Sequence, residues 1–427
     1  MNARRLLVSS LLVFAAVGAA ATVAAQSGYE PVPTLRAADL VPAALLKGPR
    51  YSVASSVPVR GLLARFSIQS DFGTFEAAGV EMLHIRIAEI AALETLEKTS
   101  KTEEFVKAAG TAAARPIKAG AHMVMNPGET VKGVGAGLSR FYDRMKMGAS
   151  SISEAGNDSS KSETEKAEDV SKRIGSVTID VLGWEEERRT LAKKLGVDPY
   201  TTNPVLSEKL SDYAWVTFSG RVGLNALVSV VVPISMVMTA TSITNDMVWD
   251  LKPADVLKAN AEKLAAMGAT QTQVQALLKN QWFSLTILTW LTNGLAELEG
   301  VVGRADLVAF AATAKSEEEA RFIAASVNML AVRHKNKPLA TVAGHGTLVG
   351  RTQAGAVLVP APVDYIAWTQ NVATFANRPD FKSAERGVWT TGKLSPRATQ
   401  EMTALGWSLN TVPQINPPAV VLPTTSR

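Results

Sequence analysis

Every second residue over positions 62–68 is apolar, and Arg65 lies between apolar neighbours. This alternation predicts a strand with one buried face. A turn at 70–73 and a short segment at 74–77 predict a return strand, so we expect a β-hairpin. From about Val80, apolar residues recur three or four positions apart, which predicts a helix.

Helical spacing dominates residues 174–335. Ser316 and Glu319 have the spacing of a capping box and predict the start of one of these helices. The acidic runs 185–187 and 317–319 fall in first helical turns, where negative charge is favourable. We therefore interpret these carboxylates as structural.

Residues 222–245 carry no charge. The segment is long enough to span a bilayer, but its serine, threonine, asparagine and proline residues dilute its hydrophobicity. Two interpretations stay open. The segment is the buried central element of a soluble domain, which we favour, or it inserts into a membrane or makes a deep lipid contact.

Short strands and capped helices alternate in the last ninety residues. Asp364 and Ser395 are the expected N-caps of two helices there. The expected strands cover 340–342, 347–349, 356–359, 388–390 and 407–409. A strand, a helix and a second strand in so few residues predict a compact βαβ unit.

These patterns predict an α+β protein that is mainly α-helical. It would have an N-terminal β-hairpin with helices, a central helical domain and a small C-terminal α/β domain. The expected divisions are a signal peptide (1–25), a Pro-rich extended leader (26–58), the hairpin with its helices (59–147), a disordered linker (148–173), the helical domain (174–335), the α/β domain (336–412) and a flexible tail (413–427). The linker is predicted because its polar residues bury too little surface to offset their ordering entropy.

The first residues have the pattern of an export signal. Arg4 and Arg5 precede an apolar run over 6–21, and small side chains follow up to Ala25. We expect cleavage after Ala25. An uncleaved anchor is disfavoured because the run is shorter than the ~20 residues that span a bilayer. The mature protein is therefore expected in the periplasm or associated with the envelope.

Composition excludes several classes of chemistry. The chain has no cysteine, so it has no disulfides, thiolate metal sites or cysteine nucleophile. Its four histidines are scattered and form no local metal-binding pair. A net charge of +5 over 427 residues is too small to indicate a nucleic-acid partner. We expect no metal and no cofactor.

One histidine is a candidate for ligand binding. It lies between two glycines, which allow a ligand to approach the backbone closely, and histidine titrates near neutral pH. Four further residues fall on nearby predicted strand ends or loops. The candidate ligand-binding residues are His345, Arg351, Asp364, Trp389 and Lys393. The alternative is a turn with a solvated histidine. No residue is predicted to be catalytic.

Five short segments carry a family likeness: Val59–Phe66, Phe72–Phe75, Arg86–Ile90, Thr391–Arg397 and Leu405–Trp407. They resemble a family of exported bacterial proteins of uncharacterised function. The resemblance covers most of the mature chain. It implies export but no activity that can be assigned to residues here.

We therefore expect an exported envelope protein that binds a partner or a membrane surface without catalysis. A weak amphipathic helix at 127–146 and the uncharged 222–245 segment support a membrane-surface or envelope-protein partner. Any small-molecule ligand is unspecified at this stage. The alternative is an exported hydrolase with its site near His345 in the C-terminal α/β domain.

Overall fold

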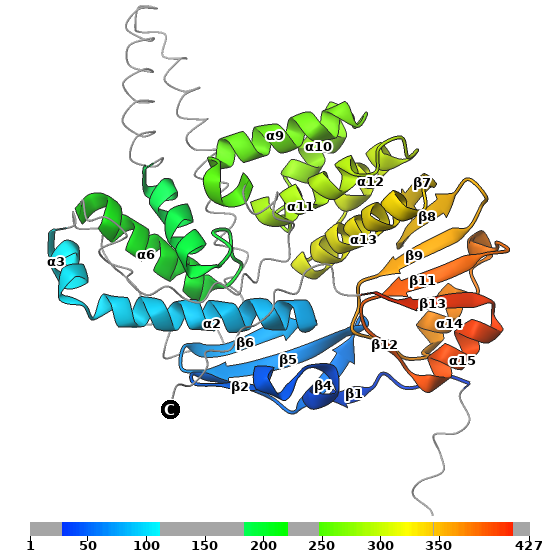
Figure 1. Ribbon diagram of the computed structural model, residues 1–427, viewed down its shortest axis with the longest axis horizontal. Coiled ribbons are helices and arrows are strands. Elements are labelled where there is room, and N and C mark those ends of the chain that lie inside the picture. Colours follow the sequence, from blue (N-terminus) through cyan, green and yellow to red (C-terminus); the bar gives the residue numbers. More distant parts are fainter. Residues whose placement is uncertain (1–27, 112–182, 221–246, 345, 413–427) are drawn as a thin grey trace, which may run out of the picture.

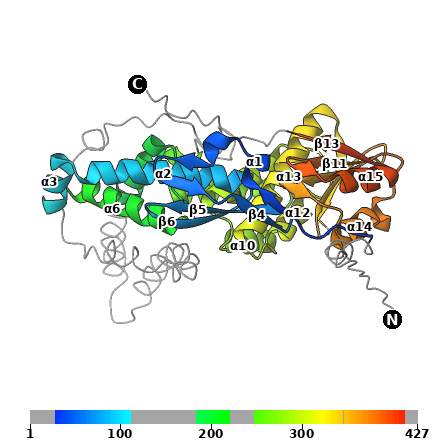
Figure 2. The same ribbon diagram turned by 90° about the horizontal axis from the view of Figure 1, so that it is seen from below.

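The computed structural model describes residues 28–111, 183–220, 247–344 and 346–412. The described part is elongated (Figures 1 and 2). Helices α3 (Glu103–Thr111) and α6 (Pro204–Gly220) lie at one end, and α14 (Gln370–Ala376) and α15 (Pro396–Ala404) lie at the other. The signal peptide, the 127–146 helix, the 148–173 linker, the 222–245 segment and the tail from 413 lie outside the described residues.

The N-terminal part contains a six-stranded sheet among the described residues. Its order is β1-β4-β5-β3-β2, with β6 paired to the other edge of β5. The strands are β1 (Thr34–Arg36), β2 (Lys47–Gly48), β3 (Tyr51–Val53), β4 (Ser56–Arg60), β5 (Leu63–Ser70) and β6 (Gly73–Ala78). A short helix α1 (Ala37–Leu40) and a 3₁₀ turn η1 (Ala43–Leu45) connect β1 to β2.

The alternation over 62–68 sets the two faces of β5. Ala64, Phe66 and Ile68 are fully buried against helix α2 (Val80–Ser100) and its neighbours. Arg65 therefore projects from the opposite face. The predicted hairpin is confirmed, because β5 pairs with β6 from Arg65↔Ala78 to Ser70↔Gly73.

The described middle of the chain is helical. Residues 183–195 form a helix, and α6 follows. The further helices are α9 (Pro253–Ala266), α10 (Gln271–Leu278), α11 (Leu285–Ala296), α12 (Arg304–Ala311) and α13 (Glu317–Asn336). Leu191, Leu206 and Leu210 are buried with the N-terminal sheet and α2, whereas α9 to α13 build a second cluster with the start of the C-terminal sheet. Within the described ranges, no helix is both long and apolar enough to cross a bilayer.

Among the described residues, the C-terminal part forms a five-stranded sheet of order β13-β11-β9-β8-β7. Its strands are β7 (Leu339–Gly344), β8 (Leu348–Thr352), β9 (Val357–Ala361), β11 (Arg386–Thr390) and β13 (Trp407–Thr411), with a 3₁₀ turn η3 (Pro379–Phe381) before β11. β9, β11 and β13 run parallel, and α15 connects the last two. The predicted βαβ unit is therefore confirmed. A small pair of strands, β10 (Tyr365–Ile366) and β12 (Lys393–Leu394), lies beside it.

The predicted fold class is wrong. The molecule is not mainly α-helical with one N-terminal hairpin, because its helices share the fold with two large sheets. Strands β1 to β4 lie where five prolines indicated an extended leader. Pro58 is accommodated because the pairing of β4 with β5 begins only at Val59, so no hydrogen bond to β5 is lost there. These strands are two to five residues long, which is too short for alternation to be recognised.

The N- and C-terminal sheets are joined by backbone contacts. The turn between β4 and β5 has Gly61 at φ 59° and Leu62 at φ 67°, a left-handed conformation that is unfavourable for leucine. The Leu62 carbonyl accepts hydrogen bonds from the N–H groups of Asp364 and Tyr365, at 3.1 and 3.2 Å. Leu62 also packs against the C-terminal core. The tip of this hairpin is thus fixed to the opposite end of the chain.

Candidate functional site

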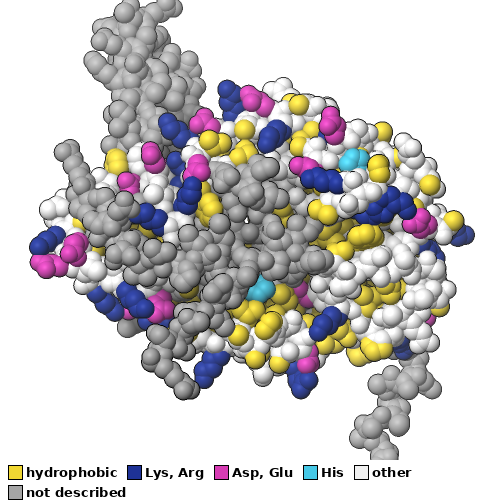
Figure 3. Space-filling view, in the orientation of Figure 1, with side chains coloured by type: hydrophobic (Ala, Val, Ile, Leu, Met, Phe, Trp, Pro, Cys, Tyr) yellow, Lys and Arg dark blue, Asp and Glu magenta, His cyan; other side chains and the backbone are white. Residues whose placement is uncertain are grey.

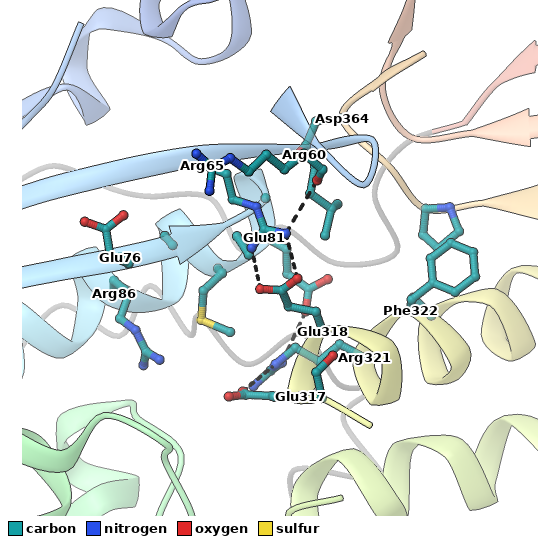
Figure 4. Close-up of a pocket in the computed structure, with 18 of the residues that line it drawn as sticks. Arg60, Arg65, Glu76, Glu81, Arg86, Glu317, Glu318, Arg321, Phe322 and Asp364 are labelled. Carbon is teal, nitrogen blue, oxygen red and sulfur yellow. Dashed lines mark hydrogen bonds and ion pairs between the residues drawn. The ribbon is translucent and has the colours of Figure 1, made fainter. Parts of the chain in front are cut away.

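A cavity of about 790 Å³ lies where the N-terminal sheet, the start of α2 and the start of α13 meet (Figure 4). We call it the charged cavity. Its charged lining residues are Arg60, Arg65, Glu76, Glu81, Arg86, Glu317, Glu318, Arg321 and Asp364. Trp282, Trp290 and Phe322 contribute aromatic surface. Residues more than 200 positions apart in the sequence therefore share one lining.

The N-terminal turn of α13 supplies the acidic wall. Ser316 caps this helix by accepting a hydrogen bond from the Glu319 N–H at 3.1 Å. Glu317 and Glu318 lie in its first turn, where the helix dipole favours carboxylates. Arg321 lies one turn later, on the same side as Glu317. The local sequence thus places two acids and one base at the same end of the helix.

Arg65 and Glu318 form a two-pronged ion pair across the cavity wall (Figure 4). Arg65 Nη2 lies 2.7 Å from Glu318 Oε2, and Nη1 contacts Oε1. Their side chains are 28% and 42% exposed. The parallel geometry fixes the planes of both groups.

Arg321 holds the deeper part of the lining together. Its Nε lies 2.8 Å from Glu317 Oε1, and its Nη1 lies 3.3 Å from Glu81 Oε1. Burial acts to lower the pKa of Arg321, but Glu317 and Glu81 outweigh it and the pKa is raised. Burial likewise acts to raise the pKa of Glu317, but Arg321 and Arg86 lower it overall. Both groups therefore stay charged.

A second ion pair extends this network beneath the cavity. Arg86 Nη1 lies 2.7 Å from Glu89 Oε2, and Arg86 Nη2 lies 3.1 Å from the Thr202 hydroxyl. Thr202 in turn donates to Glu317 at 3.1 Å. Thr201 and Asn203 also donate to Glu89. The loop before α6 thus connects α2 to α13.

Asp364 reaches the cavity from the C-terminal part. It accepts hydrogen bonds from the N–H groups of Ala64 at 2.8 Å and Val80 at 3.1 Å. It therefore satisfies the start of α2, where Gly79 has no side chain to act as a cap. Burial raises the pKa of Asp364 to about 6, although the two N–H groups act to lower it. Gly392 lets the chain at residue 392 pack directly against the backbone of residue 364, since a Cβ at Gly392 would lie 2.2 Å from the Asp364 carbonyl oxygen.

Two charged groups of the cavity stand apart from this network. Arg60 ends β4 and Glu76 lies on β6, and both are exposed. Neither forms an ion pair with another residue in the described ranges. They lie on either side of Arg65 on the same sheet. These two side chains are therefore available to a ligand, whereas the other charges hold the wall.

The four described ligand candidates do not share one site, although the Lys393 N–H donates to the Asp364 carbonyl oxygen at 3.0 Å. His345 lies outside the described residues, so the hydrolase interpretation centred on it stays a prediction. Arg351 donates to the Asp380 carbonyl oxygen. The Arg333 guanidinium lies 5.1 Å from the centre of the Trp389 ring, and Lys393 Nζ lies 2.6 Å from the Asp39 carbonyl oxygen.

Asp364 alone of the four described candidates lines the charged cavity. It is not the helix cap that we expected for the following residues, because Thr369 caps α14 by accepting from the Val372 N–H at 3.3 Å. Asp364 instead caps α2, which begins 284 residues earlier. No local pattern indicates a cap that acts at this distance.

Sequence reasoning missed most of the cavity. The alternation over 62–68 predicts only that Arg65 lies on the polar face of a strand, and the acidic run 317–319 predicts only a favourable helix start. The sequence offers one signal for this ion pair: a charged residue on an alternating strand and an acidic helix start elsewhere in the chain. Nothing in the sequence showed that the two would meet.

The described side chains limit what this site can do. Among the described residues, no group of three or more histidine, aspartate or glutamate side chains is arranged to hold a metal ion. Most carboxylates of the cavity are paired with arginines, whereas Asp364 accepts hydrogen bonds from two backbone N–H groups. No protein-family model, curated protein or solved structure matches this chain.

Proposed function

We propose that the chain is an exported envelope protein that binds a short peptide in the charged cavity without catalysis. The observation that carries this proposal is the pair of uncommitted, opposite charges, Arg60 and Glu76, at two ends of one lining. A ligand with an anion at one end and a cation at the other would complement both. The aromatic lining residues would contact its side chains.

The register of the sheet gives the length of such a ligand. Arg60 pairs with Leu63, and Glu76 pairs with Ser67 on the other edge of β5. The two positions are thus about 13 Å apart along β5 and about 10 Å apart across it, or roughly 16 Å in total. An extended peptide advances ~3.3 Å per residue. Because the side chains of Arg60 and Glu76 line the cavity and occupy part of this distance, a peptide of about three to five residues would span the remainder.

The rest of the cavity favours binding over reaction. The ion pairs of Arg65 and Arg321 fix the walls before a ligand arrives, which lowers the entropy cost of binding. The volume of about 790 Å³ lies in the range of small-ligand sites. Export itself rests on the N-terminal signal pattern and is proposed together with the binding function.

Calorimetric titration with tetraalanine tests the proposal. We expect saturable binding to one site. Acetylating the peptide amine or amidating its carboxylate should each weaken binding about fivefold, the size of a partly exposed ion pair. Glu76→Gln should remove the effect of acetylation, and Arg60→Gln should remove the effect of amidation.

Two exposed charges outside the cavity provide the controls. Glu104→Gln on α3 and Arg36→Gln on β1 should bind every peptide as the unmodified protein does. If free and blocked peptides bind equally, or if no peptide of three to five residues binds, the proposed function is wrong.

A further inference from the structure

A second cavity, of about 860 Å³, lies on the other side of the Arg65–Glu318 ion pair. We call it the apolar cavity. It is bordered by the tip of the β4–β5 hairpin, the α12–α13 connection, the C-terminal sheet and α14. Leu63, Arg65, Ser316, Glu318 and Phe322 line both cavities and form the wall between them. Its lining is more aliphatic and aromatic than that of the charged cavity and carries fewer charged residues.

Large apolar side chains remain partly exposed around this cavity. Leu62, Leu63, Phe310, Phe322 and Phe375 all line it and are only half-buried. Figure 3 shows hydrophobic side chains gathered right of the centre of the molecule, on the face seen in Figure 1. A folded protein ordinarily fills such space with its own side chains. Several half-buried apolar residues around one hollow therefore indicate a hydrophobic occupant.

One cation lies at the rim of the apolar cavity. Lys315 is exposed, and its ammonium group has no carboxylate partner within the described ranges. The neighbouring acids are already engaged: Glu319 accepts the Lys315 backbone N–H at 2.7 Å, and Glu318 is paired with Arg65. An anionic group at this rim would therefore gain a charge partner without displacing an existing one.

We propose that the apolar cavity is a second ligand site, which binds an aliphatic carboxylate with its hydrocarbon chain inside and its carboxylate at Lys315. The chain is recognised by burial of apolar surface, which scales with its length. The head group is selected by the charge of Lys315. This site is separate from the peptide site and does not depend on it.

Calorimetric titration with dodecanoate, below its micelle concentration, tests the proposal directly. We expect one dodecanoate per chain. Hexanoate should bind more than about a hundredfold more weakly, because six fewer methylene groups are buried. Dodecyltrimethylammonium has the same chain with the opposite charge, and it should bind at least about tenfold more weakly than dodecanoate.

Two matched pairs of variants locate the site. Asn371 and Thr374 are both exposed on α14, but only Asn371 lines the cavity. Asn371→Trp should abolish dodecanoate binding, and Thr374→Trp should leave it unchanged. Lys315 and Lys335 lie near opposite ends of α13. Lys315→Gln should weaken dodecanoate binding about threefold, and Lys335→Gln should not.

Thermal unfolding of each variant shows whether it is folded, and tetraalanine binding provides an independent control on the neighbouring cavity. Equal binding of dodecanoate to Asn371→Trp and to the unmodified protein would overturn the proposal. So would equal affinities for dodecanoate and hexanoate, or binding of dodecanoate only as part of phospholipid vesicles.

Discussion

The two cavities share a wall but are built in opposite ways. The charged cavity is held by ion pairs that join α2, the loop before α6 and α13, and its polar groups are largely satisfied by one another. The apolar cavity is bordered by half-buried leucine and phenylalanine side chains and by a strained turn. The comparison shows that one site is preorganised by charge, whereas the other depends on an occupant to complete its packing.

The largest expected change in stability follows from removing Arg321, which holds the charged cavity together. Arg321→Met leaves Glu317 and Glu81 without their shared cation, and we expect the free energy of unfolding to fall by about 3–5 kcal/mol. Urea denaturation measures this loss. Lys335→Met, which removes an exposed ion pair with Glu297, is the matched control and should cost less than about 1 kcal/mol. Equal losses in the two variants would show that the network is not structural.

The next effect concerns Asp364, which faces the charged groups Glu81 and Arg65 and connects the two ends of the chain. Because burial raises its pKa from 3.8 to about 6, protonation stabilises the folded state. This contribution is fully present below pH 3.8 and is lost as the pH rises through 6. Between pH 4 and pH 7, the unfolding free energy should therefore fall by up to about 3 kcal/mol relative to Asp364→Asn.

Urea denaturation of both proteins at several pH values isolates this contribution, since the other carboxylates are common to both. Asparagine keeps a carbonyl oxygen that accepts one of the two backbone N–H groups. A stability difference that does not change with pH would contradict the prediction.

A smaller change in stability is expected from a substitution in the turn between β4 and β5, which borders the apolar cavity. Gly61→Ala places a side chain at φ 59°, which should cost about 1 kcal/mol even though no atom lies within 4 Å of the new Cβ. Gly110→Ala in α3 has equally open surroundings and no positive φ. It should stabilise the protein by about 0.5–1 kcal/mol, because alanine favours helices. Thermal unfolding compares the two, and a stabilising Gly61→Ala would rule out strain at the turn.

The smallest expected effect on stability concerns the wall itself. Glu318→Gln removes one partner of an ion pair whose side chains are 28% and 42% exposed. We expect a change of less than about 1 kcal/mol in the unfolding free energy. Arg65 then becomes available to anions, so dodecanoate should bind about threefold more tightly in calorimetric titration. Weaker dodecanoate binding would indicate that Glu318 itself contacts the ligand.

Local features of the fold were predictable from the sequence. The hairpin of β5 and β6, the start of α2 at Val80 and the Ser395 cap of α15 follow from alternation, spacing and capping within a few residues. Strands β1 to β4 were missed because they are short and lie in a proline-containing segment, with Pro58 inside β4, and because pairing with other strands decides their structure. Tertiary pairing here outweighs local propensity.

The candidate site was much less predictable. Asp364 is a predicted ligand residue that lines the cavity, but the helix that it caps was predicted wrongly, because its partners Ala64 and Val80 lie about 300 residues away. Arg65 and Glu318 each have an ordinary local explanation, on a strand face and at a helix start. Only the approach of the α13 N-terminus to β5, where Arg65 pairs with Glu318, turns them into a wall between two cavities.

The contacts between the chain ends set an order of folding. The N-terminal strands are synthesised first, yet Glu30 accepts hydrogen bonds from the Trp368 N–H and the Ser395 hydroxyl, both at 2.5 Å. The start of α2 likewise acquires its acceptor only when residue 364 has been made. Contacts of such long sequence separation form slowly. Glu30 and the start of α2 therefore stay incompletely hydrogen-bonded until residues 395 and 364, respectively, have been synthesised.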